Sequence, residues 1–337
     1  MDIVLYLKNL QGRGVQKVYL NLAKGLQELG HHVHFVIRQN RIELDYRFLE
    51  HFYLFEENVT AHLDILLAQL DDPVLIANDV KTTLELKNIA PERIYHTVHM
   101  LWGERIFKQL RLLKWFELKR LYRDKQLIGV SEAVKEDLLH KVKIEPKSIE
   151  VIADGFDIEA IQALAQEPID VQGDYILNIG ALSREKNQKL LLESYAKLDT
   201  PLALVILGEG KLKASLEKLA HQLGIAERVH FLGFKPNPYP YIKHAKLVVS
   251  TSTNEALPGV AIESLILHTP VVSTDSLGIR SVLTGKFDAF IVKQASALPA
   301  AIEKALKAYP TIGSDDYEQF GYREVALAYL NVVRRVS

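Results

Sequence analysis

The 337-residue sequence contains no cysteine. This absence excludes disulfide bonds, a thiolate nucleophile and cysteine ligands for a metal ion. It is typical of proteins from a reducing compartment, so the expected location is the cytoplasm. The N-terminal residues lack the basic leader and the long apolar stretch of a secretory signal peptide, which agrees with that expectation.

An excess of charge and long apolar runs are also lacking. The 41 basic and 42 acidic residues give a formal net charge of −1, so nucleic acid is not an expected partner. No run of about 18 apolar residues occurs, which argues against a membrane-spanning helix. Clustered carboxylates of the Asp-x-Asp kind are absent as well. We therefore expect no metal and no other cofactor in the chemistry.

Short apolar runs rich in β-branched residues alternate with helical patterns along the chain. This alternation predicts an α/β protein with two Rossmann-like, doubly wound domains facing across a cleft. A break in the pattern places the first domain at residues 1–165 and the second at 166–315. Six strands are predicted in each half: Ile3–Leu7, Val33–Ile37, Val74–Ala77, Ile94–Val98, Leu127–Val130 and Glu150–Ile152, then Tyr175–Ile179, Ala203–Leu207, Val229–Leu232, Leu247–Ser250, Pro270–Ser273 and Phe290–Val292.

A glycine-containing loop, Gly12-Arg13-Gly14, follows the first predicted strand and precedes a predicted helix. Glycine permits close approach of a ligand, and the amides at a helix start favour an anion. A dinucleotide fingerprint would require a third glycine where Lys17 stands, so a nicotinamide-dependent enzyme is the weaker alternative. A tight turn without a ligand also remains open.

The segment Glu255-Ala-Leu-Pro-Gly-Val-Ala-Ile-Glu263 is the strongest local signal. It leads from a predicted strand into a helix that begins near Pro258, a residue suited to a first helical turn. The amides of Leu257, Gly259 and Val260 are candidates for binding a diphosphate. Glu255 lies in the loop, whereas Glu263 lies on an otherwise apolar helix, where an unpartnered buried carboxylate would be costly. The alternative is a pair of solvated glutamates.

These residues resemble the donor site of the retaining GT-B glycosyltransferases of group 1, the large family with a Glu-x7-Glu motif that includes bacterial lipopolysaccharide and capsule transferases. The resemblance covers nearly the whole chain. It includes Ile128–Val134, Val151–Asp157 and Asn178–Asn187. It implies that Glu255 contacts hydroxyl groups of the donor sugar and that Glu263 contacts the ribose. It also implies that the final helix, within residues 316–337, packs back on the first domain.

The resemblance further implies transfer of a hexose or N-acetylhexosamine from a nucleotide diphosphate sugar, in the commonest bacterial case a UDP-sugar. The acceptor would be a glycan or a lipid-linked sugar in surface polysaccharide or lipopolysaccharide synthesis. Lys186 matches the family's lysine that binds the leaving phosphate, and His99 resembles a histidine near the donor sugar and acceptor. Front-face displacement, in which the leaving phosphate deprotonates the acceptor, would retain the anomeric configuration.

Three positions depart from the family pattern. Arg13-Gly14 replaces two consecutive glycines, and Ala153-Asp154-Gly155 replaces Pro-Asn-Gly. Ala181 stands where many members carry an arginine, and Arg184 on the same loop is the candidate substitute. Because this arginine is missing, a catalytically inactive GT-B chain that acts as a binding protein remains an alternative.

Two further segments have charged or ligating side chains. The predicted helix 104–125 combines large apolar residues with eight cations and three acids, which favours either contact with an anionic membrane surface or a solvated crossover helix. The histidines at 31, 32 and 34 open a strand, where alternation separates their side chains between two faces. No metal site is therefore predicted there.

Overall fold

The computed structural model describes residues 1–12, 14–78, 93–107 and 112–334. The chain divides into two compact units, and each is described separately. Unit 1 comprises Met1–Asp157 and Gln319–Ser337, and unit 2 comprises Ile158–Glu318. The predicted boundary at residue 165 lies later in the chain, directly after helix α7 (Ile158–Leu164), which belongs to unit 2.

Unit 1 is built on a seven-stranded parallel sheet with the strand order β3-β2-β1-β4-β5-β6-β7. The strands are β1 (Asp2–Leu7), β2 (His32–Ile37), β3 (His51–Leu54), β4 (Val74–Asn78), β5 (Ile94–Val98), β6 (Gln126–Gly129) and β7 (Ser148–Val151). The described helices are α1 (Val15–Glu28), α2 (Val59–Gln69), α4 (Trp102–Phe107), α5 (Leu112–Tyr122), α6 (Glu132–Glu136), the π-helical turn η2 (Asp137–Val142) and α13 (Tyr322–Arg334).

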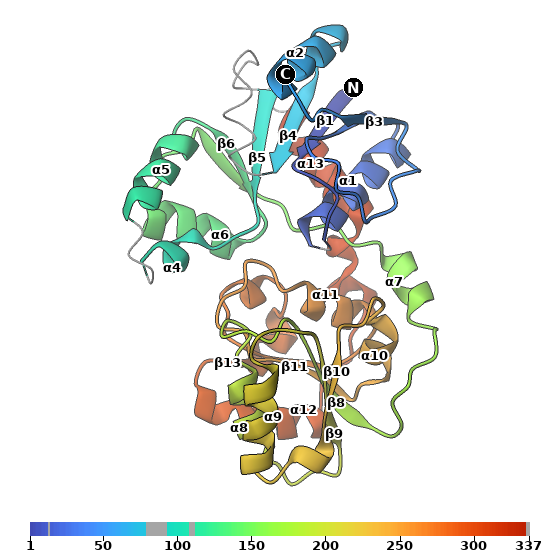
Figure 1. The fold of residues 1–337 in the computed structure, drawn as a ribbon, viewed down its shortest axis with the longest axis vertical. Coiled ribbons are helices and arrows are strands. Elements are labelled where there is room, and N and C mark those ends of the chain that lie inside the picture. Colours follow the sequence, from blue (N-terminus) through green and yellow to red (C-terminus); the bar gives the residue numbers. More distant parts are fainter. Residues whose placement is uncertain (13, 79–92, 108–111, 335–337) are drawn as a thin grey trace. The chain divides into compact units, whose positions relative to one another are not determined.

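Apolar side chains cover both faces of the unit 1 sheet. On one face, Phe35 and other strand residues pack with Leu26 of α1 and Leu330 of α13. On the other face, Val4 and Val36 pack with Leu63 of α2. Figure 1 shows α13 beside α1, although nearly 300 residues separate them in sequence. Helix α13 thus completes the core of a unit whose strands and other described α-helices all precede residue 158.

Unit 2 contains a six-stranded parallel sheet with the order β10-β9-β8-β11-β12-β13. Its strands are β8 (Tyr175–Ile179), β9 (Ala203–Leu207), β10 (Val229–Gly233), β11 (Leu247–Ser250), β12 (Val271–Thr274) and β13 (Ile291–Val292). After α7, its helices are α8 (Gln188–Tyr195), α9 (Lys213–Gln222), α10 (Tyr239–His244), α11 (Gly259–Ile266) and α12 (Leu298–Lys307). Its short 3-10 helices are η3 (Ala226–Arg228), η4 (Gly278–Ser281), η5 (Gly285–Phe290), η6 (Ala295–Ala297) and η7 (Ser314–Asp316), and η8 (Glu318–Phe320) spans the boundary to unit 1.

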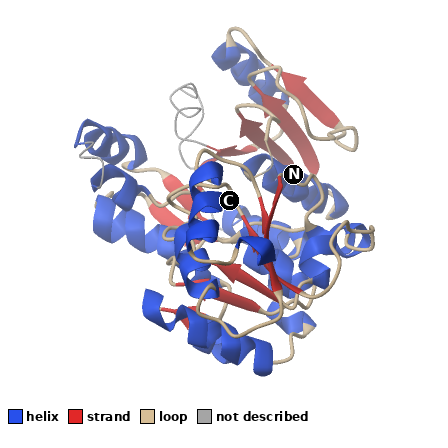
Figure 2. Ribbon diagram, turned by 60° about the horizontal axis from the view of Figure 1, so that its bottom comes forward, coloured by secondary structure: helices blue, strands red, loops and turns tan. Residues whose placement is uncertain are grey.

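The two sheets share one topology. In both, the first strand of the unit lies between the second and the fourth, so that the strand order reverses there. Figure 2 shows strands flanked by helices in this doubly wound arrangement. The predicted fold class is therefore confirmed. The sequence missed one strand, β3, which lies at the edge of the unit 1 sheet and contains no β-branched residue.

The basic segment predicted as a helix over 104–125 includes the end of α4 and all of α5, and residues 108–111 lie outside the described part of the chain. Helix α5 buries Leu118 and Tyr122. None of the helices in the described ranges combines the length and apolarity that crossing a bilayer requires.

Candidate active site

The candidate site of unit 2 lies where the order of its strands reverses. Strands β8 and β11 are neighbours in the sheet and parallel, so the loops that follow them leave at the same edge. Lys186 belongs to the loop between β8 and α8, and Glu255 belongs to the loop between β11 and α11. Crevices at this position bind ligands in doubly wound sheets.

Two hydrogen bonds to backbone carbonyl oxygens hold these two loops together. The Thr251 hydroxyl donates a hydrogen bond to the carbonyl oxygen of Lys186 at 2.9 Å. The backbone N–H of Thr253 donates to the carbonyl oxygen of Glu185 at 2.8 Å. The position of Lys186 is therefore fixed by the segment that leads to Glu255, and not only by its own loop.

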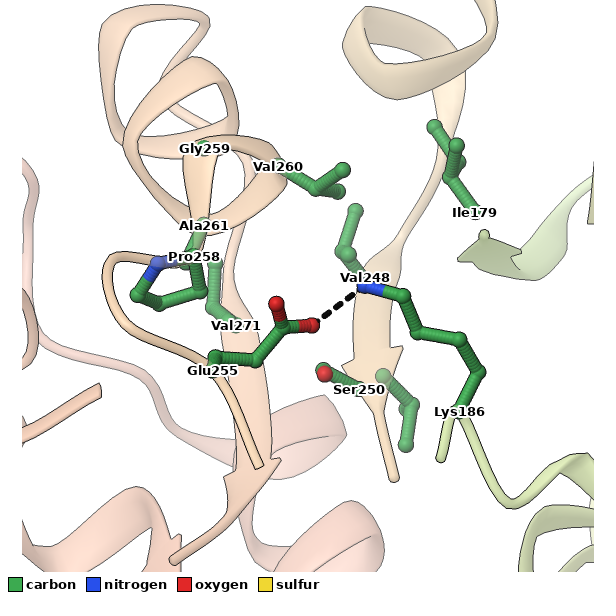
Figure 3. Close-up of a pocket in the computed structure, with 11 residues that line it drawn as sticks. Ile179, Lys186, Val248, Ser250, Glu255, Pro258, Gly259, Val260, Ala261 and Val271 are labelled. Carbon is green, nitrogen blue, oxygen red and sulfur yellow. Dashed lines mark hydrogen bonds and ion pairs between the residues drawn. The ribbon is translucent and has the colours of Figure 1, made fainter. Parts of the chain in front are cut away.

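The side chains of Lys186 and Glu255 form an ion pair, although 69 residues separate them in sequence. They are partly exposed, at 31% for Lys186 and 19% for Glu255. Figure 3 shows the ammonium and the carboxylate extended toward each other from opposite sides of a pocket. The other residues that line this pocket come from β8, β11, β12 and the start of α11: Ile179, Val248, Val249, Ser250, Pro258, Gly259, Val260, Ala261 and Val271.

The loop that carries Glu255 is also held from its other side, by the segment after β12. The backbone N–H of Glu255 donates to Ser276 O at 3.1 Å, and the N–H of Gly278 donates to Glu255 O at 3.0 Å. A Cβ at Gly278 would lie 2.3 Å from the carbonyl oxygen of Ala256 and 2.5 Å from that of Glu255. Only glycine permits this approach, so Gly278 is a supporting residue that the sequence analysis missed.

Helix α11 begins beside this ion pair. Pro258 is its N-cap, and Gly259 and Val260 begin the helix and line the pocket. The first amides of a helix have no acceptor within it, and they carry the positive end of the helix dipole. Leu257 and Glu263 are not among the lining residues. Glu263 is partly buried on the second turn of α11 and makes contacts of its own within the chain.

The loop after β8 also contains Ala181, which departs from the family pattern, and Arg184, the candidate substitute for the missing arginine. Ala181 and Arg184 are both exposed, and neither lines the pocket. The carbonyl oxygen of Ala181 accepts a hydrogen bond from the buried Gln188 side chain at 3.1 Å. Of the described residues that line the pocket, Lys186 is the sole cation.

The remaining predicted site residues, Gly14 and His99, belong to unit 1. Gly14 is the exposed N-cap of α1 and follows the loop after β1, and Arg13 lies outside the described residues. His99 directly follows β5, and its side chain is only 9% exposed. Its Nε2 lies 3.1 Å from the Thr97 hydroxyl, and its Nδ1 lies 3.1 Å from a carboxylate oxygen of Asp154.

The His99 contacts extend into the core of unit 1. The Thr97 hydroxyl also lies 2.7 Å from the hydroxyl of Tyr19 on α1. Burial raises the pKa of Tyr19, so this phenol stays neutral. The sequence identified Asp154 only as a departure from the family pattern. Its contact with His99 links two loops that lie more than 50 residues apart in sequence.

Comparison with known families assigns most of the chain. Residues 12–160 match the family profile described as glycosyltransferase family 4. Residues 161–323 match the profile described as glycosyl transferases group 1. The two matches meet within α7, and together they account for both units apart from the chain ends.

Curated relatives are similar over part of their length. The chain is 39% identical, over 165 residues, to the Campylobacter jejuni N-acetylgalactosamine-N,N'-diacetylbacillosaminyl-diphospho-undecaprenol 4-alpha-N-acetylgalactosaminyltransferase. That match covers 49% of this chain and 45% of the relative. An uncharacterized glycosyltransferase of Methanocaldococcus jannaschii is 30% identical over 223 residues, which cover 62% of this chain and 52% of the relative. The chain thus spans about half the length of the curated relatives that it matches.

Among solved structures, Anabaena HepE in complex with UDP and glucose superposes with a TM-score of 0.75. The superposition covers 99% of this chain and 100% of HepE, at 16% identity. At that identity the likeness shows the fold alone, which is the two-domain GT-B arrangement.

Proposed function

Because the chain belongs to the group 1 glycosyltransferases of the GT-B fold, we propose that it is a retaining glycosyltransferase. It transfers a hexose or N-acetylhexosamine from a nucleotide diphosphate sugar to a glycan or lipid-linked acceptor. The observation that carries this proposal is the meeting of Lys186 and Glu255 beside the start of α11. This arrangement offers a cation, a carboxylate and helix-start amides to one ligand.

Cleavage of a sugar–diphosphate bond leaves negative charge on the departing phosphate. Preorganised cations and amides that point at this charge lower the barrier. Lys186 and the amides of Gly259 and Val260 are suited to that role, and no metal is needed for it. Glu255 then contacts hydroxyl groups of the transferred sugar, and Glu263 contacts the ribose.

The ion pair supports a simple account of donor binding. In the free protein, the carboxylate of Glu255 holds the ammonium of Lys186 at the pocket. An incoming diphosphate competes for the same ammonium, which releases Glu255 to accept hydrogen bonds from the sugar. A partly exposed pair of this kind is weak enough to exchange partners.

The number of carboxylates at the pocket bears on how the anomeric configuration would be retained. Retaining glycosidases that use a covalent intermediate need two carboxyl groups on opposite sides of the sugar. Of the described residues that line the pocket, Glu255 is the sole carboxylate. We therefore favour front-face displacement, in which the leaving phosphate takes the proton of the acceptor hydroxyl.

The relatives suggest the substrates. HepE was solved with UDP and glucose, and the Campylobacter relative is named for transfer to a diphospho-undecaprenol-linked sugar. We propose a UDP-sugar as donor and a lipid-linked surface polysaccharide or lipopolysaccharide intermediate as acceptor.

A lipid-linked acceptor requires access to a membrane surface, and α5 is suited to provide it. Leu112, Leu113 and Phe116 are 57%, 88% and 61% exposed. Arg120 and Arg123 are exposed near the end of the same segment. Apolar side chains that protrude beside cations are typical of helices that lie on anionic lipid. We propose peripheral contact with the inner face of the cytoplasmic membrane through this helix.

The deciding experiment measures UDP binding by calorimetry and sugar transfer from a panel of UDP-sugars, with the product anomer assigned by NMR. The proposal expects saturable UDP binding and transfer with retention. UDP binding without transfer from any donor would favour an inactive GT-B binding protein, and binding of NAD in place of UDP would favour a nicotinamide enzyme.

The variant Glu255→Gln tests the role of the carboxylate. It should lower turnover strongly, while affinity for UDP stays within about threefold because its partner is the sugar rather than the nucleotide. Loss of UDP binding with an unchanged rate for bound donor would reverse the proposed roles of Glu255 and Glu263.

A further inference from the structure

Three metal-ligating side chains meet where strands β2 and β3 begin. His32 is the first residue of β2, His51 is the first residue of β3, and Glu50 directly precedes His51. One ligand atom from each residue lies within 4.8 Å of the other two. Among the residues that the structure describes, no other group of three histidine, aspartate or glutamate side chains has its ligand atoms this close together.

The parallel pairing of β2 and β3 creates this group. His34 is in register with His51. Alternate residues of a strand point to the same face, so His32 and His34 share a face with His51. Strand β2 alone places neighbouring histidines on opposite faces of the sheet. Strand β3 adds His51 to the face that carries His32 and His34, so histidines from two strands come together there.

The ring of His51 is held in position by His34. It stacks on the ring of His34, with centroids 4.7 Å apart and planes inclined by 8°. His34 is buried and has polar contacts at both nitrogens: Nε2 lies 3.2 Å from Asp2 Oδ1, and Nδ1 lies 3.3 Å from the Tyr53 hydroxyl. A ligand whose orientation is set by fixed neighbours loses less freedom when a metal binds.

We propose that His32, Glu50 and His51 bind a divalent transition-metal ion of the zinc class. Two imidazole nitrogens and one carboxylate oxygen suit such ions, and water completes the coordination. Magnesium and calcium prefer sets of oxygen ligands, so they are poor occupants. Small shifts of the exposed side chains would bring the three ligand atoms to bonding distance.

The position of this site indicates a structural role. All strands of the unit 1 sheet are parallel, and the site lies at the amino-terminal ends of β2 and β3. The Gly14 loop and His99 follow the carboxyl-terminal ends of β1 and β5, so they lie at the opposite ends of the strands. Strand β3 is a four-residue edge strand. A metal held by His32 and His51 would fasten it to β2.

The test uses the full chain without an affinity tag, titrated with ZnCl2 in a calorimeter and heated with and without ZnCl2. We expect one saturable site and a Tm that rises with ZnCl2, because an ion that binds only the folded state stabilises it by mass action. MgCl2 should leave the Tm unchanged. Zinc affinity should fall at least about tenfold in His32→Ala, in His51→Ala and in Glu50→Gln, which keeps the shape of the side chain.

The matched control is His230→Ala, which removes an exposed strand histidine of unit 2 and should bind zinc like the unchanged protein. Absence of saturable ZnCl2 binding in the unchanged protein would overturn the proposal. Equal zinc affinity in His32→Ala and His51→Ala would overturn it as well. Neither result bears on sugar transfer, which is assayed separately.

Discussion

Units 1 and 2 share a sheet topology but differ in what their loops hold at the carboxyl ends of the strands. In unit 2, Lys186 and Glu255 face a pocket and pair with each other across it. In unit 1, both ring nitrogens of His99 contact groups of the same unit, Thr97 and Asp154. The same framework therefore supports an open site in one unit and a largely buried cluster of side chains in the other, in which His99 Nδ1 lies near Asp154 without forming a hydrogen bond. Chemistry follows from the loops and not from the topology.

This difference suggests a division of labour. An ion pair between partly exposed groups can exchange one partner for a ligand at low cost. The network around His99 ends on the buried Tyr19, so disrupting it would leave buried polar groups unsatisfied. Unit 2 should therefore determine donor affinity, whereas the unit 1 network should mainly determine the stability of its own loops.

The largest effect should come from Lys186→Ala. It removes the cation that we propose to stabilise the developing charge on the leaving phosphate, so kcat should fall by about 10²–10³. Steady-state kinetics measure this, with Lys189→Ala as the control, since Lys189 pairs with Glu193 on the exposed side of α8. Retained activity in Lys186→Ala would contradict the proposal that unit 2 provides the site for the donor.

The variant Arg184→Ala sharpens the same test. If Arg184 replaces the family arginine missing at Ala181, its loss should slow turnover by about the same factor as the loss of Lys186, and Ala181→Arg should partly restore the rate. Full activity in Arg184→Ala would show that Arg184 is not needed to stabilise the charge on the leaving phosphate, and would leave that role to Lys186 and the α11 amides.

Glu263→Ala should weaken donor and UDP binding together, because the proposed partner of Glu263 is the ribose that both ligands contain. Loss of one charge-assisted hydrogen bond should cost roughly 1.5–3 kcal/mol. Calorimetry with UDP measures the change, and circular dichroism checks that the variant is folded. An unchanged UDP affinity would remove Glu263 from the donor site.

Charge reversal at the end of α5 and directly after it tests the proposed membrane contact of unit 1, which does not depend on the loops at its sheet. Arg120→Glu and Arg123→Glu should each weaken binding to anionic vesicles by about 1 kcal/mol, with a strong dependence on salt. Sedimentation with phosphatidylglycerol vesicles provides the measurement, and neutral vesicles serve as the control. Equal partition of the variants and the unchanged protein would count against membrane contact.

The smallest effect should come from Asp154→Asn, which restores the family residue. The substitution removes the charge beside His99 and keeps the size of the side chain, so the free energy of unfolding should fall by about 1 kcal/mol. Urea unfolding measures this change. UDP affinity should stay the same, and a marked loss of UDP affinity would show that the two units do not divide their roles in this way.

Much of the fold could be predicted from the sequence because buried parallel strands leave uninterrupted apolar runs. Strand β3 was missed because His51–Leu54 contains no β-branched residue and lies at an edge, where pairing rather than composition decides the structure. The histidine group at β2 and β3 was missed for the same reason, since its second strand was not foreseen.

The motifs located the candidate site, but not its contacts. The spacing of Glu255 and Glu263 indicates a loop and a helix, and both residues lie there. That Lys186 meets Glu255 depends on the adjacency of β8 and β11 and on the Thr251 hydroxyl, which no local pattern encodes. The same holds for His99 and Asp154, whose contact depends on how the loops after β5 and β7 fold.

The return of α13 to unit 1 has a consequence for synthesis on the ribosome. A Cβ at Gly25 of α1 would lie only 2.7 Å from the Tyr322 carbonyl oxygen, which shows how closely α13 covers α1. Unit 2 is continuous in sequence, whereas unit 1 lacks this cover until α13 has been translated. At roughly 5–20 residues per second, translating the intervening 161 residues of unit 2 takes roughly 8–30 s. During that interval α1 is without the cover that α13 gives it in the folded protein, and we expect unit 2 to complete its fold before unit 1 although it is translated second.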